Sequence, residues 1–206
     1  MNKTGTTSLA SAFRGLGLRV GDQAIAESLI DCWMERDFKP ILAFCESADA
    51  FQDIPFSLDY TYQAVDQAFP GSKFILTVRD SPQVWFQSLV RFHAHMFGAG
   101  RTPTAEDLAR AGYRYEGWAL KAVQAMFPSS GDLLYDEDHL LARYRAHNER
   151  IRRYFRSRPE DLLELNLRCE RSMDRLCAFL GLPQTGEPMP WVNRGSGVLS
   201  RDLSPT

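Results

Sequence analysis

The feature that most constrains the fold is a pair of short apolar runs, KFILTV at residues 73–78 and LLELNL at 162–167. Each run has the length and side-chain content of a buried strand. They are separated by long segments of helical periodicity, which is typical of crossover connections between parallel strands. The sequence therefore predicts an α/β fold with a central, mostly parallel sheet flanked by helices. Ligands of such sheets bind beyond the carboxyl ends of the strands.

Helices are predicted from apolar spacing and from stop signals. In the first, Leu9, Phe13 and Leu16 lie on one stripe, and Gly17 ends the helix. Further helices are predicted at residues 23–37, at 57–69, from 81–82 onward, at 104–127 with a break near 112, at 136–155 and at 171–180. Residues 53–56 predict a loop, because Pro55 favours extended geometry at Ile54.

The length and the charge of the chain limit the class of protein to which it can belong. A chain of 206 residues with 44% hydrophobic residues predicts one globular domain over residues 1–206. Its 24 basic and 26 acidic residues give a net charge of -2, which argues against nucleic-acid binding but allows a local anion pocket. Neither a membrane span nor a signal peptide is expected. Four cysteines without C-x-x-C spacing predict buried thiols and a reducing, cytoplasmic location.

The run N-K-T-G-T-T-S-L at residues 2–9 leads directly into the first predicted helix. A glycine allows close approach of a ligand to the backbone, and the N–H groups and dipole of a helix N-terminus attract anions. The predicted phosphate-binding loop consists of Lys3, Thr4, Gly5, Thr6, Thr7 and Ser8. The order differs from G-x-x-x-x-G-K-[ST], because the lysine precedes the glycine. A simple polar helix cap is the alternative.

A second anion-binding pair follows the first predicted strand. Arg79 comes directly after the strand and Ser88 lies on the next helix, so a guanidinium and a hydroxyl can bind one phosphate from two sides. The alternative is an ordinary salt bridge between Arg79 and Asp80. No clustered metal ligands are seen, so no metal is expected.

These motifs resemble those of bacterial-type sulfotransferases that use 3′-phosphoadenosine-5′-phosphosulfate (PAPS). The resemblance extends to L-C-A-F-L-G at residues 176–181, to P-M-P-W-V-N at 188–193 and to the helix containing His147 and Asn148, and so covers residues 2 to about 194. It implies a three-layer P-loop-type fold and transfer of a sulfuryl group from PAPS to the hydroxyl of a small molecule or glycan. Residues 92–135 would form a helical excursion that binds the acceptor. The oligomeric state stays open.

The same resemblance implies roles for individual residues. Lys3 would stabilise charge on the leaving phosphate, and Arg79, Ser88 and Arg194 would bind the 3′-phosphate. Asp53, 26 residues before Arg79, is the first candidate for the general base. His93 and His95 are the second candidates, and helical spacing allows only one of them to face the site. The alternative for Asp53 is a cap on a helix or turn.

Three departures from the family pattern are visible. The family has a strand before the loop, whereas this sequence begins at the loop; the expectation is a missing strand and an unpaired neighbouring edge. Compared with the family pattern, this sequence has one extra residue between Arg79 and the segment that contains Ser88. Ser8 stands where animal cytosolic enzymes have a tryptophan that stacks on adenine.

Two other functions remain open at this point. A nucleotide kinase is the weaker alternative, because neither the G-K-[ST] order nor a magnesium site is evident. A non-catalytic nucleotide-binding or interaction protein derived from a sulfotransferase is the stronger one. Metal-dependent binding of ATP would favour the kinase, and absence of turnover would favour the non-catalytic protein.

Overall fold

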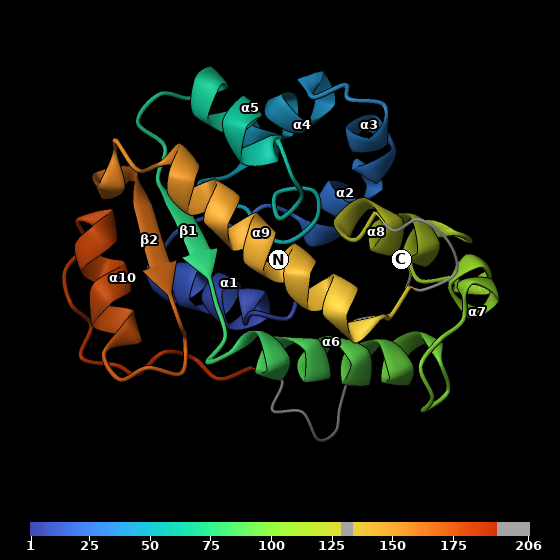
Figure 1. Cartoon of the computed structure of the whole chain (residues 1–206). Helices are drawn as coiled ribbons and strands as arrows, with labels where there is room; N and C mark the ends of the chain where they lie inside the picture. The colour runs from blue at the N-terminus through green and yellow to red at the C-terminus, as the bar shows by residue number, and fades with distance from the viewer. Residues whose placement is uncertain (129–133, 193–206) are drawn as a thin grey trace.

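The computed structural model describes residues 1–128 and 134–192, in which helices surround a small sheet (Figure 1). The elements are α1 (Thr6–Gly15), α2 (Gln23–Ser28), α3 (Ile30–Met34), α4 (Lys39–Phe44), the 3₁₀ turn η1 (Cys45–Ser47), α5 (Thr61–Ala68), β1 (Phe74–Thr77), α6 (Pro82–Phe97), α7 (Ala105–Arg110), α8 (Trp118–Met126), α9 (Glu137–Tyr154), η2 (Pro159–Asp161), β2 (Leu162–Leu165) and α10 (Ser172–Leu180).

The two predicted strands are present and parallel. Phe74 lies opposite Leu162 and Thr77 opposite Leu165. An isolated parallel bridge joins Val20 to Ala50. Within the described residues the sheet has these two strands, so the fold is a mixed α/β arrangement with a small open parallel sheet. The larger central sheet of a three-layer P-loop fold stays a prediction.

Helices pack against both faces of this sheet. On one face, the ring of Phe74 lies 4.8 Å from that of Phe155, which follows α9. On the other face, Ile75 packs beside Leu9 and Phe13 of α1. Side chains alternate along a strand, so neighbouring residues of β1 contact different helices. This arrangement places the N-terminus of α1 at the carboxyl end of β1, where Thr4 and Thr77 are hydrogen-bonded.

Several helices differ in extent from the prediction. The helix at 136–155 is confirmed as α9, capped by Asp136. The helix predicted at 23–37 is two short helices instead, because Leu29 leaves helical geometry between them. The segment 104–127 breaks into α7 and α8, with Gly117 in the left-handed conformation. Helix α5 begins at Thr61 rather than at 57, because Tyr60 has a positive φ of 68°.

The excursion at 92–135 contributes to the larger hydrophobic core. Trp85 and Leu89 of α6, Phe127 after α8, and Leu140 of α9 are all fully buried in one cluster. Burial of such side chains contributes roughly 1.5–3 kcal/mol each relative to exposure. The excursion is therefore held to α6 and α9 by a continuous apolar interface.

The cysteines are free, and their burial differs from one to another. Cys177 is buried, Cys32 and Cys45 are partly buried, and Cys169 is exposed, so the expectation of buried thiols is wrong for Cys169. None of the helices in the described part of the chain is both long and apolar enough to cross a membrane.

Candidate active site

Gly5 gives the N-terminal loop its shape. It caps α1 with a φ of 107°, in the region that L side chains rarely adopt. A Cβ placed on Gly5 would overlap the side chain of Leu167, which follows β2. Glycine is therefore required here both by the backbone conformation and by close packing. The adjacent Lys3 also has a positive φ, of 65°, which is uncommon for a residue with a side chain.

The N-terminus of α1 is open to an anion. No side chain caps this helix, and the first N–H groups of any helix lack intrahelical acceptors. Thr7 is exposed, whereas Thr6 donates a 3.1 Å hydrogen bond to Asp53. Ser8 is buried and accepts a hydrogen bond from the N–H of Val192 at 3.1 Å. The free N–H groups and the helix dipole together favour negative charge at this end.

Three side chains fix the loop to the carboxyl end of β1 and to α6. The indole Nε1 of Trp85 donates to the carbonyl of Asn2 at 3.0 Å. The guanidinium Nε of Arg79 donates to the carbonyl of Lys3 at 2.7 Å. The hydroxyls of Thr4 and Thr77 lie 2.5 Å apart. Each bond reaches backbone or side-chain atoms of residues 2–4, so the loop is positioned before any ligand binds.

The side chain of Lys3 is partly buried rather than in open solvent. Its Nζ is 3.5 Å from the centroid of the Phe92 ring, a distance at which a cation is attracted by the aromatic face. Burial lowers the pKa of Lys3 to about 8, with Asp53 acting in the opposite direction and Arg79 in the same one. Lys3 is thus a cation whose pKa lies well below that of an exposed lysine.

Asp53 occupies the loop before α5 with a positive φ of 58°. Its carboxylate accepts hydrogen bonds from the hydroxyl of Thr6 and from the N–H of Ile54, both at 3.1 Å. Burial raises the pKa of Asp53, against the effects of the N-terminal amine, these bonds and Lys3. The hydrogen bond with Thr6 shows that the side chain of Asp53 faces the N-terminal loop. A turn role is also present, because its carbonyl accepts from the N–H of Ser57.

Arg79 follows β1 as expected and does not pair with Asp80. Asp80 instead contacts Arg168 at 3.1 Å. Ser88 lies on α6 between Trp85, which bonds Asn2, and Phe92, which contacts Lys3. Residues three or four apart share a helix face, so Ser88 is on the face of α6 that meets the loop. A shared phosphate between Arg79 and Ser88 stays a prediction. Arg194 lies outside the described residues.

The two histidines of α6 have different environments, as their spacing predicts. His93 is buried, and its Nδ1 lies 2.7 Å from the hydroxyl of Tyr135. Burial, and then the charge of Lys3, lower the pKa of His93 to about 3. His95 is exposed. His93 is therefore the histidine beside the site, and it is neutral at physiological pH.

His147 belongs to a separate buried ionic cluster. Asp59 lies 3.0 Å from His147, 2.7 Å from Arg150 and 3.2 Å from Arg143. Burial opposes ionisation of Asp59, but the bonds from His147 and Arg150 hold the pKa of Asp59 well below its usual range. The arginine-rich face of α9 is thus partly used to bind Asp59, which lies before α5.

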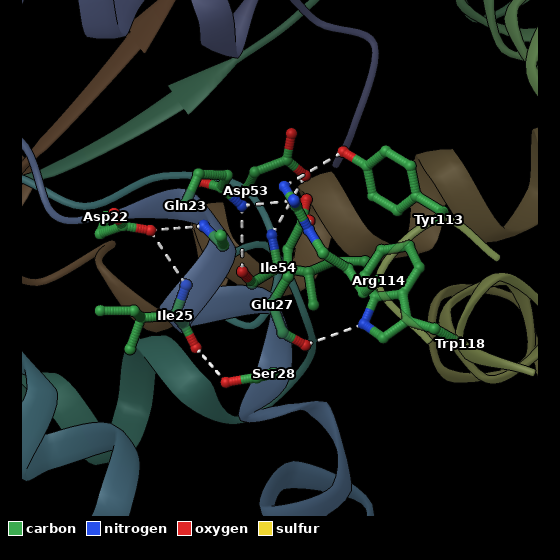
Figure 2. A network of polar contacts seen from close by, with 11 residues as sticks. Asp22, Gln23, Ile25, Glu27, Ser28, Asp53, Ile54, Tyr113, Arg114 and Trp118 are labelled. Atoms are coloured by element: carbon green, nitrogen blue, oxygen red, sulfur yellow. Dashed lines mark hydrogen bonds and ion pairs between the residues drawn. The ribbon is translucent and has the colours of Figure 1, made fainter. Parts of the chain in front are cut away.

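A network that sequence reasoning missed lies beside Asp53 (Figure 2). Glu27 of α2 is buried and pairs with Arg114 of the excursion at 2.5 Å. Gln23 bridges Glu27 and the carbonyl of Ile54. Burial raises the pKa of Glu27, the bond to Arg114 lowers it, and the charge of Asp53 raises it. Glu27 and Arg114 are 87 residues apart, so no local pattern could have paired them.

The described residues of the site contain no cluster of metal ligands. Among residues 1–128 and 134–192, no group of three or more histidine, cysteine, aspartate or glutamate side chains could hold a metal ion. The groups that meet at the loop are instead a lysine, an arginine, hydroxyls, a carboxylate and free backbone N–H groups. This set can hold an anion and transfer a proton.

The geometry is that of an α/β protein in which a glycine loop opens a helix whose first N–H groups have no side-chain cap. Comparison with known proteins gives the family. Residues 1–198 match the sulfotransferase domain family, and the chain belongs to it. No curated protein sequence matches the chain.

Proposed function

We propose that the protein is a PAPS-dependent sulfotransferase that transfers a sulfuryl group to the hydroxyl of a small molecule or glycan. One observation carries the proposal beyond family membership. The carboxylate of Asp53 accepts a hydrogen bond from Thr6, in the first turn of the uncapped helix α1, and the cation of Lys3 belongs to the loop that opens this helix. In-line group transfer needs a positive charge on the leaving side and a base on the attacking side.

The residues at the loop fit the donor nucleotide. A 5′-phosphosulfate requires close approach to the backbone, and the left-handed Gly5 followed by the uncapped N–H groups of α1 would supply it. Lys3, Thr7 and the backbone N–H of Thr6 would hold this end, and Arg79 with Ser88 would hold the 3′-phosphate. The donor supplies an activated sulfuryl group, so the protein contributes position and charge.

Each charged residue then has a distinct task. Lys3 stabilises the negative charge that develops on the bridging oxygen of the leaving phosphate. Asp53 accepts the proton of the attacking hydroxyl, and its raised pKa makes it a better proton acceptor than an exposed aspartate. The hydrogen bond from Thr6 orients the carboxylate. His93 lies beside Lys3 and is the alternative base.

The first test is calorimetric binding of adenosine 3′,5′-bisphosphate, with and without magnesium and with ATP as the competitor. Metal-independent binding at micromolar concentration, with at least tenfold preference over ATP, is the expected result. Preference for ATP with magnesium would assign the site to a kinase. No binding by a folded sample would favour a non-catalytic protein.

A second test separates the base from the donor site. Asp53→Asn should lower turnover by about 10²–10⁴-fold, while the affinity for the bisphosphate changes less than threefold. Glu35→Gln, which alters an exposed carboxylate after α3, is the control and should change neither. Retained turnover in Asp53→Asn together with loss in His93→Gln would move the base to His93.

A further inference from the structure

Trp191 differs from the other tryptophans of the chain in its exposure to solvent. Trp33, Trp85 and Trp118 are each at most 6% exposed, whereas Trp191 is 49% exposed. Burial of a large aromatic side chain is favourable, but single exposed apolar residues are common on protein surfaces. The exposure of Trp191 therefore indicates a ligand only if its position and its neighbours do so as well.

The backbone on both sides of Trp191 is held against α1. The N–H of Val192 donates to the hydroxyl of Ser8 at 3.1 Å, and Ser8 is itself buried in the first turn of α1. Met189 packs against the apolar cluster that includes Leu9 of the same helix. The segment after α10 thus returns to the carboxyl ends of the strands (Figure 1). These contacts fix Trp191 beside the N-terminus of α1, while its ring stays half exposed.

A guanidinium lies over the ring of Trp191. The Cζ of Arg168, which follows β2, is 5.8 Å from the centroid of that ring. Arg168 also pairs with Asp80 at 3.1 Å, and Asp80 is the residue after Arg79. Burial, and then the charge of Arg168, lower the pKa of Arg79. Arg168 therefore connects the ring of Trp191 with the cation that the proposed function assigns to the 3′-phosphate.

This arrangement suits a flat heteroaromatic ring that is joined to phosphates. An indole offers a large face for stacking, and stacking on an aromatic side chain is open to every nucleobase. The guanidinium of Arg168 can contact the same ring system or a nearby phosphate. The uncapped N–H groups of α1 favour negative charge at the same end of the molecule. A purine nucleotide carries both of these parts in one molecule.

We propose that Trp191 is the stacking surface for the purine base of the donor nucleotide, with Arg168 beside the same base. This inference rests on the proposed function, because it gives a place to the base of the donor whose phosphates the loop would bind. Ser8 acts as a positioning residue, since its hydroxyl holds Val192 and thereby the backbone that carries the indole. Trp191 contributes affinity and selection for a base, and takes no part in the transfer step.

The first measurement is calorimetry with two ligands that differ only in the base, adenosine 3′,5′-bisphosphate and methyl riboside 3,5-bisphosphate. Trp191→Ala should weaken binding of the adenosine compound about tenfold or more and change binding of the riboside less than about twofold. Trp191→Phe retains an aromatic face and should recover most of the lost affinity. Tyr60→Ala removes another exposed aromatic ring that lies beside an arginine. This matched control should bind both ligands as the natural chain does.

Fluorescence gives a second readout, which does not depend on activity. Because Trp191 is half exposed and the other three tryptophans are buried, acrylamide should quench mainly the emission of Trp191. Saturation with adenosine 3′,5′-bisphosphate should protect this emission from acrylamide, whereas saturation with the riboside should not. Trp191→Phe should remove both the accessible emission and its protection.

The outcomes separate this inference from the proposed function. Equal weakening of both ligands in Trp191→Ala would mean that Trp191 supports the loop rather than the base. Unchanged affinity for the adenosine compound would mean that the base lies elsewhere. Either result overturns the inference and leaves the proposed function standing. Failure of the folded natural chain to bind the adenosine compound would overturn the proposed function, and this inference with it.

Discussion

Lys3 combines a place in the N-terminal loop with a pKa well below that of an exposed lysine. Burial lowers its pKa from 10.5 to about 8, although Asp53 pulls in the other direction. The charged form, which in the proposed mechanism would stabilise the leaving phosphate, exists below this pKa and disappears above it. The kcat/KM for the donor reports the free enzyme. We therefore expect it to fall about tenfold per pH unit above pH 8, measured by release of adenosine 3′,5′-bisphosphate.

Replacement by arginine isolates this effect. Lys3→Arg keeps a cation that does not deprotonate in this range, so the alkaline decrease should vanish even though the rate at pH 7 is lower. Lys39→Arg, at an exposed lysine of α4, is the control and should retain the decrease. An alkaline limb that persists in Lys3→Arg would assign it to another group.

Helix α6 positions the loop through one of its faces. Trp85 is fully buried, stacks on Tyr144 at 4.5 Å and donates its indole N–H to the carbonyl of Asn2. Trp85→Phe retains an aromatic ring but leaves that carbonyl unpaired, at a cost of about 1–3 kcal/mol in stability. We expect the affinity for adenosine 3′,5′-bisphosphate, measured by calorimetry, to fall about fivefold. The decrease is modest because the substitution removes only part of the free energy of one contact to the loop.

A matched substitution distinguishes loop positioning from general destabilisation. Trp118 of α8 is also buried and donates its indole N–H to a backbone carbonyl, that of Glu27, at 2.9 Å. Trp118→Phe should lower stability by a similar amount while the nucleotide binds as before. If both variants lose affinity equally, α6 does not act on the loop through Trp85.

A helix or strand can be predicted from the sequence when residues close to it in the chain determine where it begins and ends. The strand at 73–78 and the helix at 136–155 were predictable because composition, spacing and the Asp136 cap agree. Helix α4 was missed, since Lys39–Phe44 spans six residues and carries a proline in its first turn. The break before α8 coincides with Gly117, which precedes the helix in the left-handed conformation with a φ of 88°.

The same distinction applies to the site in the whole molecule. The loop from Lys3 to Ser8 was readable because a glycine, hydroxyls and a lysine occur within six residues. The contact of Lys3 with Phe92 and the ion pair of Glu27 with Arg114 join segments far apart in sequence. These contacts depend on the excursion folding over α2 and α6, and a single sequence does not encode that placement in any local pattern.

Buried histidines link the stability of the whole molecule to pH. The pKa of His93 is about 3 in the folded protein, below the ordinary value of 6.5, so the unfolded chain binds a proton more readily. The stability contribution of a lowered pKa is complete above pH 6.5 and is lost as the pH falls toward 3. For His93 alone the loss between pH 7.5 and 5.5 is about 1.4 kcal/mol.

His147 has its pKa lowered to about 4 by burial and adds a loss of the same sign. Urea unfolding at pH 7.5 and 5.5 should therefore show that His93→Gln is less stable than the natural chain at pH 7.5 but has a smaller acid-induced loss, by about 1.4 kcal/mol. His95→Gln, at an exposed histidine of the same helix, should keep the full loss. An unchanged pH dependence in His93→Gln would mean that His93 is not the buried, neutral group that α6 and Tyr135 enclose, because removing such a group must remove its share of proton uptake on unfolding.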